Sequence, residues 1–133
     1  MMTCVALIDA NRNIREFCRR ELVRDGYELA LFRTPQEAAA RIRDVLPDIV
    51  VVDADAFASD AGTFAPLLET LSIPVILHDA APSDAPLPGG GPVARVVKSG
   101  DLGPLKHAIG RAVGSRRRGT RGGQPRARVD RRE

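Results

Sequence analysis

The sequence is poor in several features that mark large classes of proteins. It has no tryptophan and only two cysteines, Cys4 and Cys18, which form neither a disulfide framework nor a metal-binding spacing. No apolar run approaches the roughly 20 residues that a membrane-spanning helix needs. No basic region precedes the short apolar run that begins at Val5, so the N-terminus does not read as a signal peptide. We therefore expect a cytoplasmic protein with no membrane segment.

Motifs of common enzyme sites are also missing. The residues after the first apolar run are Asp9-Ala10-Asn11-Arg12, which is not a glycine-rich dinucleotide fingerprint. Three consecutive glycines at 89–91 lack the lysine and hydroxyl residue of a phosphate-binding loop. No Ser-His-Asp or Cys-His arrangement is apparent, and His78 and His107 are isolated. The chain is therefore not expected to be an enzyme.

Charge divides the 133 residues into two parts. Residues 115–133 carry eight arginines and two acids, a net charge of +6, which leaves −3 of the total +3 for residues 1–114. The segment 115–133 is too poor in apolar residues to offset its ordering entropy, so we expect a disordered Arg-rich tail. Its arginines could contact nucleic-acid phosphates, but no aromatic residues interleave them, so this indication is weak. Residues 1–114 form the expected domain.

Strand and helix patterns alternate along this domain. Apolar runs predict strands at 5–8, 27–32, 49–52, 74–77 and 93–97. Helices are predicted after Asn11 or Asn13 as far as Gly26, at 35–45 after the capping box Thr34–Glu37, around 64–71, and after Asp101. This alternation predicts a parallel sheet with right-handed crossovers. The segment 80–92 holds too many Pro and Gly residues for a helix, so a loop is expected there.

Charged residues follow four of the predicted strands. Asp9, Asp53 and Asp79 each end a strand, and Lys98 follows the last one. Ligands of open α/β sheets bind beyond the carboxyl ends of the strands. Carboxylates beside one ammonium suit a divalent cation and a phosphoryl group, and a carboxylate in such a cluster could accept the phosphoryl. A charged residue where the chain leaves the core is, however, common at any single strand end.

Over about residues 3–114 the chain resembles the response-regulator receiver domain. The segments that carry this resemblance are, in order along the chain, Ile8-Asp9, Val50-Val51-Val52-Asp53, Pro74-Val75-Ile76-Leu77 and Val96-Val97-Lys98. The resemblance implies a doubly wound five-stranded parallel sheet of flavodoxin-like order 2-1-3-4-5. It implies a two-component phosphorelay protein with a sensor histidine kinase or phosphotransfer protein as one partner and a downstream protein as another.

The same resemblance implies roles for individual residues. Asp53 matches the phosphoacceptor, and Lys98 matches the lysine that pairs with the phosphoryl group. Asp9 matches one acid of the metal-binding pair, and Asp55 matches the position whose backbone carbonyl binds Mg²⁺. Asp60 matches an acid of the following loop. The implied metal set is therefore Asp9, Asp53 and Asp55.

The chain departs from the pattern of this family at several positions. Ala10 replaces the second acid of the pair, which weakens the expected Mg²⁺ site. The two switch positions, a hydroxyl residue and an aromatic residue in the family, are Asp79 and Arg95. The prolines usual after the acceptor and after the lysine are Phe57 and Ser99. The fourth helix of the family is replaced by the Pro/Gly-rich loop.

Two hypotheses follow. The chain is either a stand-alone receiver that takes phosphate on Asp53, or a pseudo-receiver that binds proteins without phosphorylation. A carboxylate at Asp79 would repel an aspartyl phosphate and could not donate a hydrogen bond to it, so we favour the second slightly. An ion pair between Asp79 and Lys98 is the purely structural interpretation of these charges. Fold alone settles neither.

Overall fold

The computed structural model describes residues 2–88 and 91–119. Its elements follow the chain in the order β1 (Cys4–Ile8), α1 (Arg12–Arg24), β2 (Glu28–Phe32), α2 (Pro35–Val45), β3 (Ile49–Asp53), α3 (Ala54–Ser59), α4 (Ala61–Thr70), β4 (Val75–Asp79), β5 (Pro92–Val97) and α5 (Gly103–Gly119). In the part of the chain that is described, no helix is both long and apolar enough to cross a bilayer.

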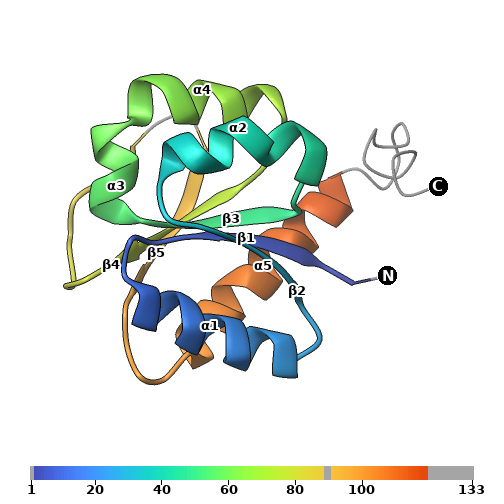
Figure 1. The fold of residues 1–133 in the computed structure, drawn as a ribbon, viewed down its shortest axis with the longest axis vertical. Coiled ribbons are helices and arrows are strands. Elements are labelled where there is room, and N and C mark those ends of the chain that lie inside the picture. The colour runs from blue at the N-terminus through green and yellow to red at the C-terminus, as the bar shows by residue number, and fades with distance from the viewer. Residues whose placement is uncertain (1, 89–90, 120–133) are drawn as a thin grey trace.

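The five strands form one sheet in the order β2-β1-β3-β4-β5, and every pair of neighbours is parallel. The predicted doubly wound sheet of flavodoxin-like order is therefore confirmed. Helices α1 and α5 cover one face, and α2, α3 and α4 cover the other (Figure 1). Because parallel strands end on the same side, the chain reverses direction beyond Asp9, Asp53 and Asp79 at one end of the sheet.

Local sequence signals explain where the helices begin. The Asn11 side chain accepts hydrogen bonds from the backbone N–H groups of Asn13 and Ile14, so it caps α1. The predicted capping box is also present, because the Thr34 hydroxyl accepts from the Glu37 N–H while the Glu37 carboxylate accepts from the Arg33 N–H. Such caps satisfy N–H groups that the first turn of a helix leaves unpaired.

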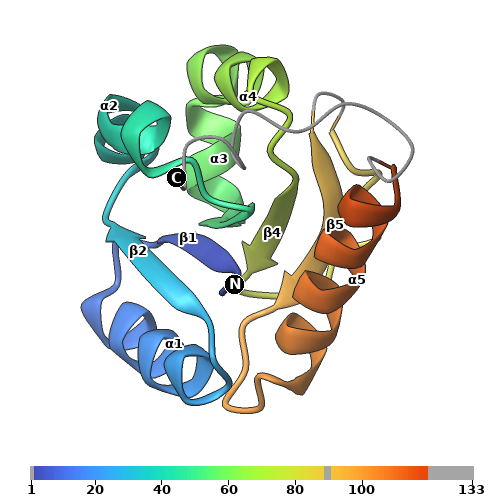
Figure 2. The same ribbon diagram turned by 90° about the vertical axis from the view of Figure 1, so that its right-hand side faces the viewer.

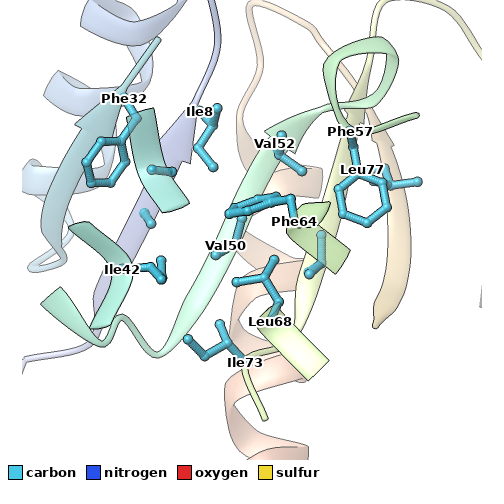
Figure 3. Packing of buried hydrophobic residues seen from close by; sticks show 13 residues of the cluster. Ile8, Phe32, Ile42, Val50, Val52, Phe57, Phe64, Leu68, Ile73 and Leu77 are labelled. Atoms are coloured by element: carbon cyan, nitrogen blue, oxygen red, sulfur yellow. The ribbon is translucent and has the colours of Figure 1, made fainter. Parts of the chain in front are cut away.

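Two apolar clusters hold the layers together, one on each face of the sheet. On the α2/α3/α4 face, Ile8, Val50 and Val52 pack against Phe57 and Phe64, whose rings meet edge to face at 6.5 Å between centroids (Figure 3). The other face is packed by side chains of α1 and α5, including Cys18, Leu105 and Ile109. The central strand β3 is buried on both faces, as its continuous run of β-branched residues predicts.

The structure differs from the expected elements at three places. A helix, α3, starts directly after Asp53, where only one later helix around 64–71 was expected before β4. In the crossover from β4 to β5, the described residues 80–88 contain no helix, which confirms the expected loop for them. Helix α5 continues past the expected domain boundary at residue 114 to Gly119, and the rest of the predicted tail lies outside the described residues.

Candidate functional site

Lys98 joins the ends of β1 and β3 at the C-terminal end of the sheet. Its Nζ lies 2.8 Å from Asp9 Oδ2 and donates to Asp53 Oδ1 at 2.5 Å. All three side chains are largely withdrawn from solvent, with 16% of Lys98, 4% of Asp9 and 23% of Asp53 exposed. Two carboxylates that are far apart in the sequence are thus both in contact with Lys98, as the positions of the three residues at strand ends predicted. We call this group the Lys98 cluster.

Within the Lys98 cluster, each charged group favours the ionised form of its partner. Burial acts to raise the pKa of Asp53, but hydrogen bonds from Lys98 and from the Ala56 N–H outweigh it, and the pKa lies below its ordinary value. Burial acts to lower the pKa of Lys98, yet hydrogen bonds to Asp53 and Asp9 outweigh it and raise that pKa. Asp53 is therefore ionised and Lys98 protonated at neutral pH.

Asp79 and Arg95 form a second ion pair at the same end of the sheet. Arg95 Nη1 donates to Asp79 Oδ2 at 3.0 Å, and the two side chains are 18% and 19% exposed. The purely structural alternative, an ion pair between Asp79 and Lys98, is not found among the described residues. Lys98 pairs instead with Asp9 and Asp53, and its backbone N–H donates to the Asp79 carbonyl at 2.7 Å. The two residues that replace the switch positions of the receiver pattern are therefore bound to each other.

The residues expected to hold Mg²⁺ do not fit a metal ion in this arrangement. Both carboxylates, Asp9 and Asp53, are paired with Lys98, and Ala10 adds no third one. The Asp55 carbonyl lies inside α3 and accepts a hydrogen bond from the Ser59 hydroxyl at 3.0 Å, so it is turned into the helix. Among the described residues, no group of three or more His, Cys, Asp or Glu side chains is placed to bind a metal.

Arg15 adds a further cation at the C-terminal end of β1, which sequence reasoning missed. Its Nη1 donates to the carbonyl of Asp9 at 2.8 Å and to that of Ala10 at 3.2 Å. The only available signal was its position on the first turn of α1, one turn beyond the Asn11 cap. Two backbone carbonyls at this strand end are thus bound by a guanidinium group. Asp60, the remaining acid of the resemblance, lies between α3 and α4.

His78 is the second residue that the sequence did not single out. It lies opposite Asp53 in the pairing of β3 with β4, it is 2% exposed, and neither ring nitrogen has a hydrogen-bond partner among the described residues. Burial, followed by the charge of Lys98, lowers its pKa. It borders a cavity of about 480 Å³ that is also lined by Phe17, Cys18 and Lys98. His78, which lies next to the Lys98 cluster, is therefore neutral at neutral pH.

Comparison with known proteins gives a uniform result for the fold. No family model and no curated protein sequence matches the chain. Among solved structures, the response regulator TrrA of Thermotoga maritima in complex with Mg²⁺ and BeF is 24% identical with a TM-score of 0.72, covering 84% of this chain and 99% of its own. The chemotaxis response regulator CheY4 of Vibrio cholerae is 19% identical with a TM-score of 0.71 over the same shares.

A third structure extends the likeness to a domain of a larger protein. The N-terminal domain of a response regulator/sensory box/GGDEF protein from Carboxydothermus hydrogenoformans is 13% identical, with a TM-score of 0.75 over 89% of this chain and 99% of that one. Identities this low speak to the fold, which matches nearly the full length of each neighbour. Together with the strand order and the Lys98 cluster, they show that this chain has the fold of the CheY-like response-regulator receiver domain.

Proposed function

We propose that the chain is a receiver-like protein-interaction module whose binding state does not depend on phosphorylation of Asp53. The observation that carries this proposal is the ion pair between Asp79 and Arg95. It joins the two positions at which the receiver pattern has a hydroxyl and an aromatic side chain. A signalling switch at these positions needs side chains that move when a phosphoryl group arrives, and here each holds the other in place.

The chemistry of Asp79 argues in the same direction. An ionised carboxylate accepts hydrogen bonds but cannot donate one, so it offers nothing to phosphoryl oxygens. Two like charges about 4 Å apart repel each other by roughly 1 to 4 kcal/mol between water-like and surface-like dielectrics. Arg95 partly neutralises Asp79, but rotation of Arg95 away from this contact would leave a carboxylate that is 19% exposed without its partner.

The Lys98 cluster supports the proposal because its charges and ligands are poorly suited to Mg²⁺. Lys98 already balances one of the two carboxylates, which leaves a net charge of −1 for Asp9, Asp53 and Lys98 together. The missing acid at Ala10 and the helical Asp55 carbonyl remove two of the groups that would draw Mg²⁺ to this place. We propose that Mg²⁺ binding is weak.

A titration with beryllofluoride and Mg²⁺, followed by amide NMR, tests the proposal. The wild-type chain is expected to show no saturable shifts at Asp53, Lys98 and their neighbours. The matched control is the triple variant Ala10→Asp, Asp79→Thr and Arg95→Tyr, which restores the receiver pattern and is expected to respond. Saturable shifts at Asp53 and Lys98 in the wild-type chain would overturn the proposal.

The second candidate is a receiver that still accepts phosphate on Asp53 from a sensor histidine kinase or phosphotransfer protein. One observation favours it, namely that the Asp53 carboxylate is held ionised beside Lys98, as a nucleophile needs to be. The wild-type response in the same titration separates the two candidates, because only this one predicts that beryllofluoride binds at Asp53.

A further inference from the structure

The cavity of about 480 Å³ beside the Lys98 cluster lies at the C-terminal end of the sheet. Its walls come from α1, which follows β1, from the end of β4 and from the segment after β5. Figure 2 shows α1 and α5 on the same face of the sheet, and the cavity lies on this face. Ligands of open α/β sheets bind at this end, and the volume is typical of small-molecule sites. We call it the α1 cavity.

The side chains that α1 contributes to the cavity are largely apolar. Ile14 and Phe17 are half-buried, and Cys18 is 1% exposed. The imidazole of His78 adds a second flat ring to that of Phe17. Apolar walls that include aromatic rings favour an occupant that is itself flat and mostly apolar, because rings stack on one another or meet edge to face.

His78 is the buried polar group of this wall. It is 2% exposed, and neither ring nitrogen has a hydrogen-bond partner among the described residues. A neutral imidazole carries one donor and one acceptor, and a buried polar group without a partner is unfavourable. The nitrogens are shielded from solvent, and the α1 cavity gives a partner a route to the ring. A hydroxyl group suits this place, because it can donate to one ring nitrogen or accept from the other.

Charge disfavours an ionic occupant. Among the described residues that line the cavity, Lys98 is the only charged one, and it is already paired with Asp9 and Asp53. A carboxylate in the cavity would lose its hydration without finding a free cation, and an ammonium group would find no acid in the lining. The occupant that fits is therefore neutral.

The chain itself supplies no group of this kind. The segment 115–133 has no aromatic residue and only one aliphatic residue larger than alanine, Val129. Among the described residues, none of the large apolar side chains that are exposed is aromatic, so a second copy has no exposed ring to insert. A small molecule from solution fits the α1 cavity better than either.

We propose that the α1 cavity binds a small neutral aromatic molecule that carries a hydroxyl group. The ring of this molecule packs against Phe17, and its hydroxyl pairs with a ring nitrogen of His78. Because Lys98 borders the cavity and also pairs with Asp53, the bound molecule lies against the Lys98 cluster. The proposal involves no phosphorylation of Asp53, so it stands or falls separately from the proposed function.

The probe is 2-naphthol, titrated into the full chain at neutral pH and followed by amide NMR. Saturable shifts are expected at residues 13–18, at His78 and at residues 98–100, with a dissociation constant below about 1 mM. Three analogues keep the same ring system. Naphthalene lacks the hydroxyl and is expected to bind about fivefold or more weakly. The anion 2-naphthoate and the cation 2-naphthylmethylammonium are expected to bind about tenfold or more weakly, because each is desolvated without a counter-charge.

Two pairs of variants locate the site, and their amide spectra check that each is folded. Ile14→Trp places a large side chain in the lining and is expected to abolish binding. Val23→Trp, at an exposed position of the same helix outside the lining, is expected to keep the affinity within about twofold. His78→Leu is expected to bind 2-naphthol and naphthalene equally, within about twofold. His107→Leu, at an exposed position on α5, should keep the preference for 2-naphthol.

The opposite results overturn the proposal. Shifts of 2-naphthol that do not saturate below about 1 mM, or that map away from the α1 cavity, would exclude the site. Equal binding by Ile14→Trp would do the same. Binding of either ion as tight as that of 2-naphthol would exclude a neutral occupant. A preference for 2-naphthol that persists in His78→Leu would exclude His78 as the partner of the hydroxyl. None of these results bears on beryllofluoride at Asp53, so the proposed function is tested independently.

Discussion

Two ion-paired groups lie at the same end of the sheet, and they differ in how they relate to the receiver pattern. The Lys98 cluster uses residue types that the pattern contains, an acid after β1, an acid after β3 and a lysine after β5. The Asp79–Arg95 pair uses residue types that the pattern does not contain at these two positions, and the ion pair joins the two side chains to each other. Both groups are less than a quarter exposed, so burial does not distinguish them.

The difference shows that departures from a pattern have to be considered in pairs. Considered alone, Asp79 is a negative charge near Asp53, the acceptor that the resemblance implies, and Arg95 is a bulky cation where the receiver pattern has an aromatic ring. In contact at 3.0 Å, each supplies the charge that makes the other acceptable in a half-buried place. Under the proposed function the pair takes the place of a switch, whereas the Lys98 cluster keeps the residue types that the receiver pattern has at its acceptor site.

The largest effect is expected from Lys98→Met, which removes the cation of the Lys98 cluster. Asp9 and Asp53 would then face each other without compensation, and the loss of one partner from a buried ion pair costs about 3–5 kcal/mol. Chemical unfolding followed by far-ultraviolet circular dichroism measures the loss.

Lys106→Ala is the matched control for this variant. Lys106 pairs with Asp25 at 2.9 Å on the surface between α5 and α1, and exposed pairs contribute little to stability. Its unfolding midpoint is expected to stay close to that of the wild type. If Lys98→Met were as stable as Lys106→Ala, the contacts of Lys98 would not hold the two carboxylates together, and the comparison of the two ion-paired groups would fail.

The second-largest effect is expected from Arg95→Tyr, with a loss of about 2 kcal/mol in the free energy of unfolding, because Asp79 stays partly buried without its partner. The double variant Asp79→Thr with Arg95→Tyr removes both charges and is expected to regain most of this loss. The free energies of unfolding of the two single variants and the double variant form a cycle that measures the coupling. Additive losses would mean that the two positions act independently.

The sequence predicted the Lys98 cluster because position alone determines it. Asp9, Asp53 and Lys98 each follow a strand, and parallel strands end together, so their convergence needs no knowledge of side-chain conformation. Position alone did not predict the strand order, which came from the resemblance to the receiver domain. The capping signals at Asn11 and Thr34 were equally local, which is why the starts of α1 and α2 agree with the structure.

The Asp79–Arg95 pair could not be predicted in the same way. Asp79 lies opposite Val97 in the pairing of β4 with β5, and a shift in register occurs between Val75 and Ile76, so the contact with Arg95 is diagonal across the strands. Neighbouring lysine and arginine residues compete for the same carboxylate, and the sequence does not show which one reaches it. The start of α3 was missed because Asp53, taken as a site residue, also caps that helix by accepting from the Ala56 N–H.

A smaller effect, of opposite sign, is expected from His78→Leu. The buried imidazole has no hydrogen-bond partner among the described residues, and a buried polar group without a partner lowers stability. An apolar side chain of similar size should raise the free energy of unfolding by about 1 kcal/mol. His107→Leu, at an exposed position on α5, is the control, and its free energy of unfolding is not expected to rise. A loss of stability in His78→Leu would show that the ring nitrogens are hydrogen-bonded in solution.

The smallest effect is the pH dependence that His78 confers on the wild-type chain. Burial and Lys98 lower the pKa of His78 in the folded state, against the opposing charges of Asp9 and Asp53, so below its ordinary value of 6.5 the unfolded state binds more protons. Stability from this group is therefore complete above pH 6.5 and decreases as the pH falls. The acidic groups with lowered pKa values, Glu16, Glu37 and Asp53, titrate below about 4.5 and so do not produce a decline between pH 6.5 and 5. Unfolding free energies of the wild type should decline between pH 6.5 and 5, while those of His78→Leu stay level.

A decline of the same size in the variant would mean that His78 is as easily protonated in the folded chain as in the unfolded one. The environment of the Lys98 cluster would then be more open to water than its burial indicates.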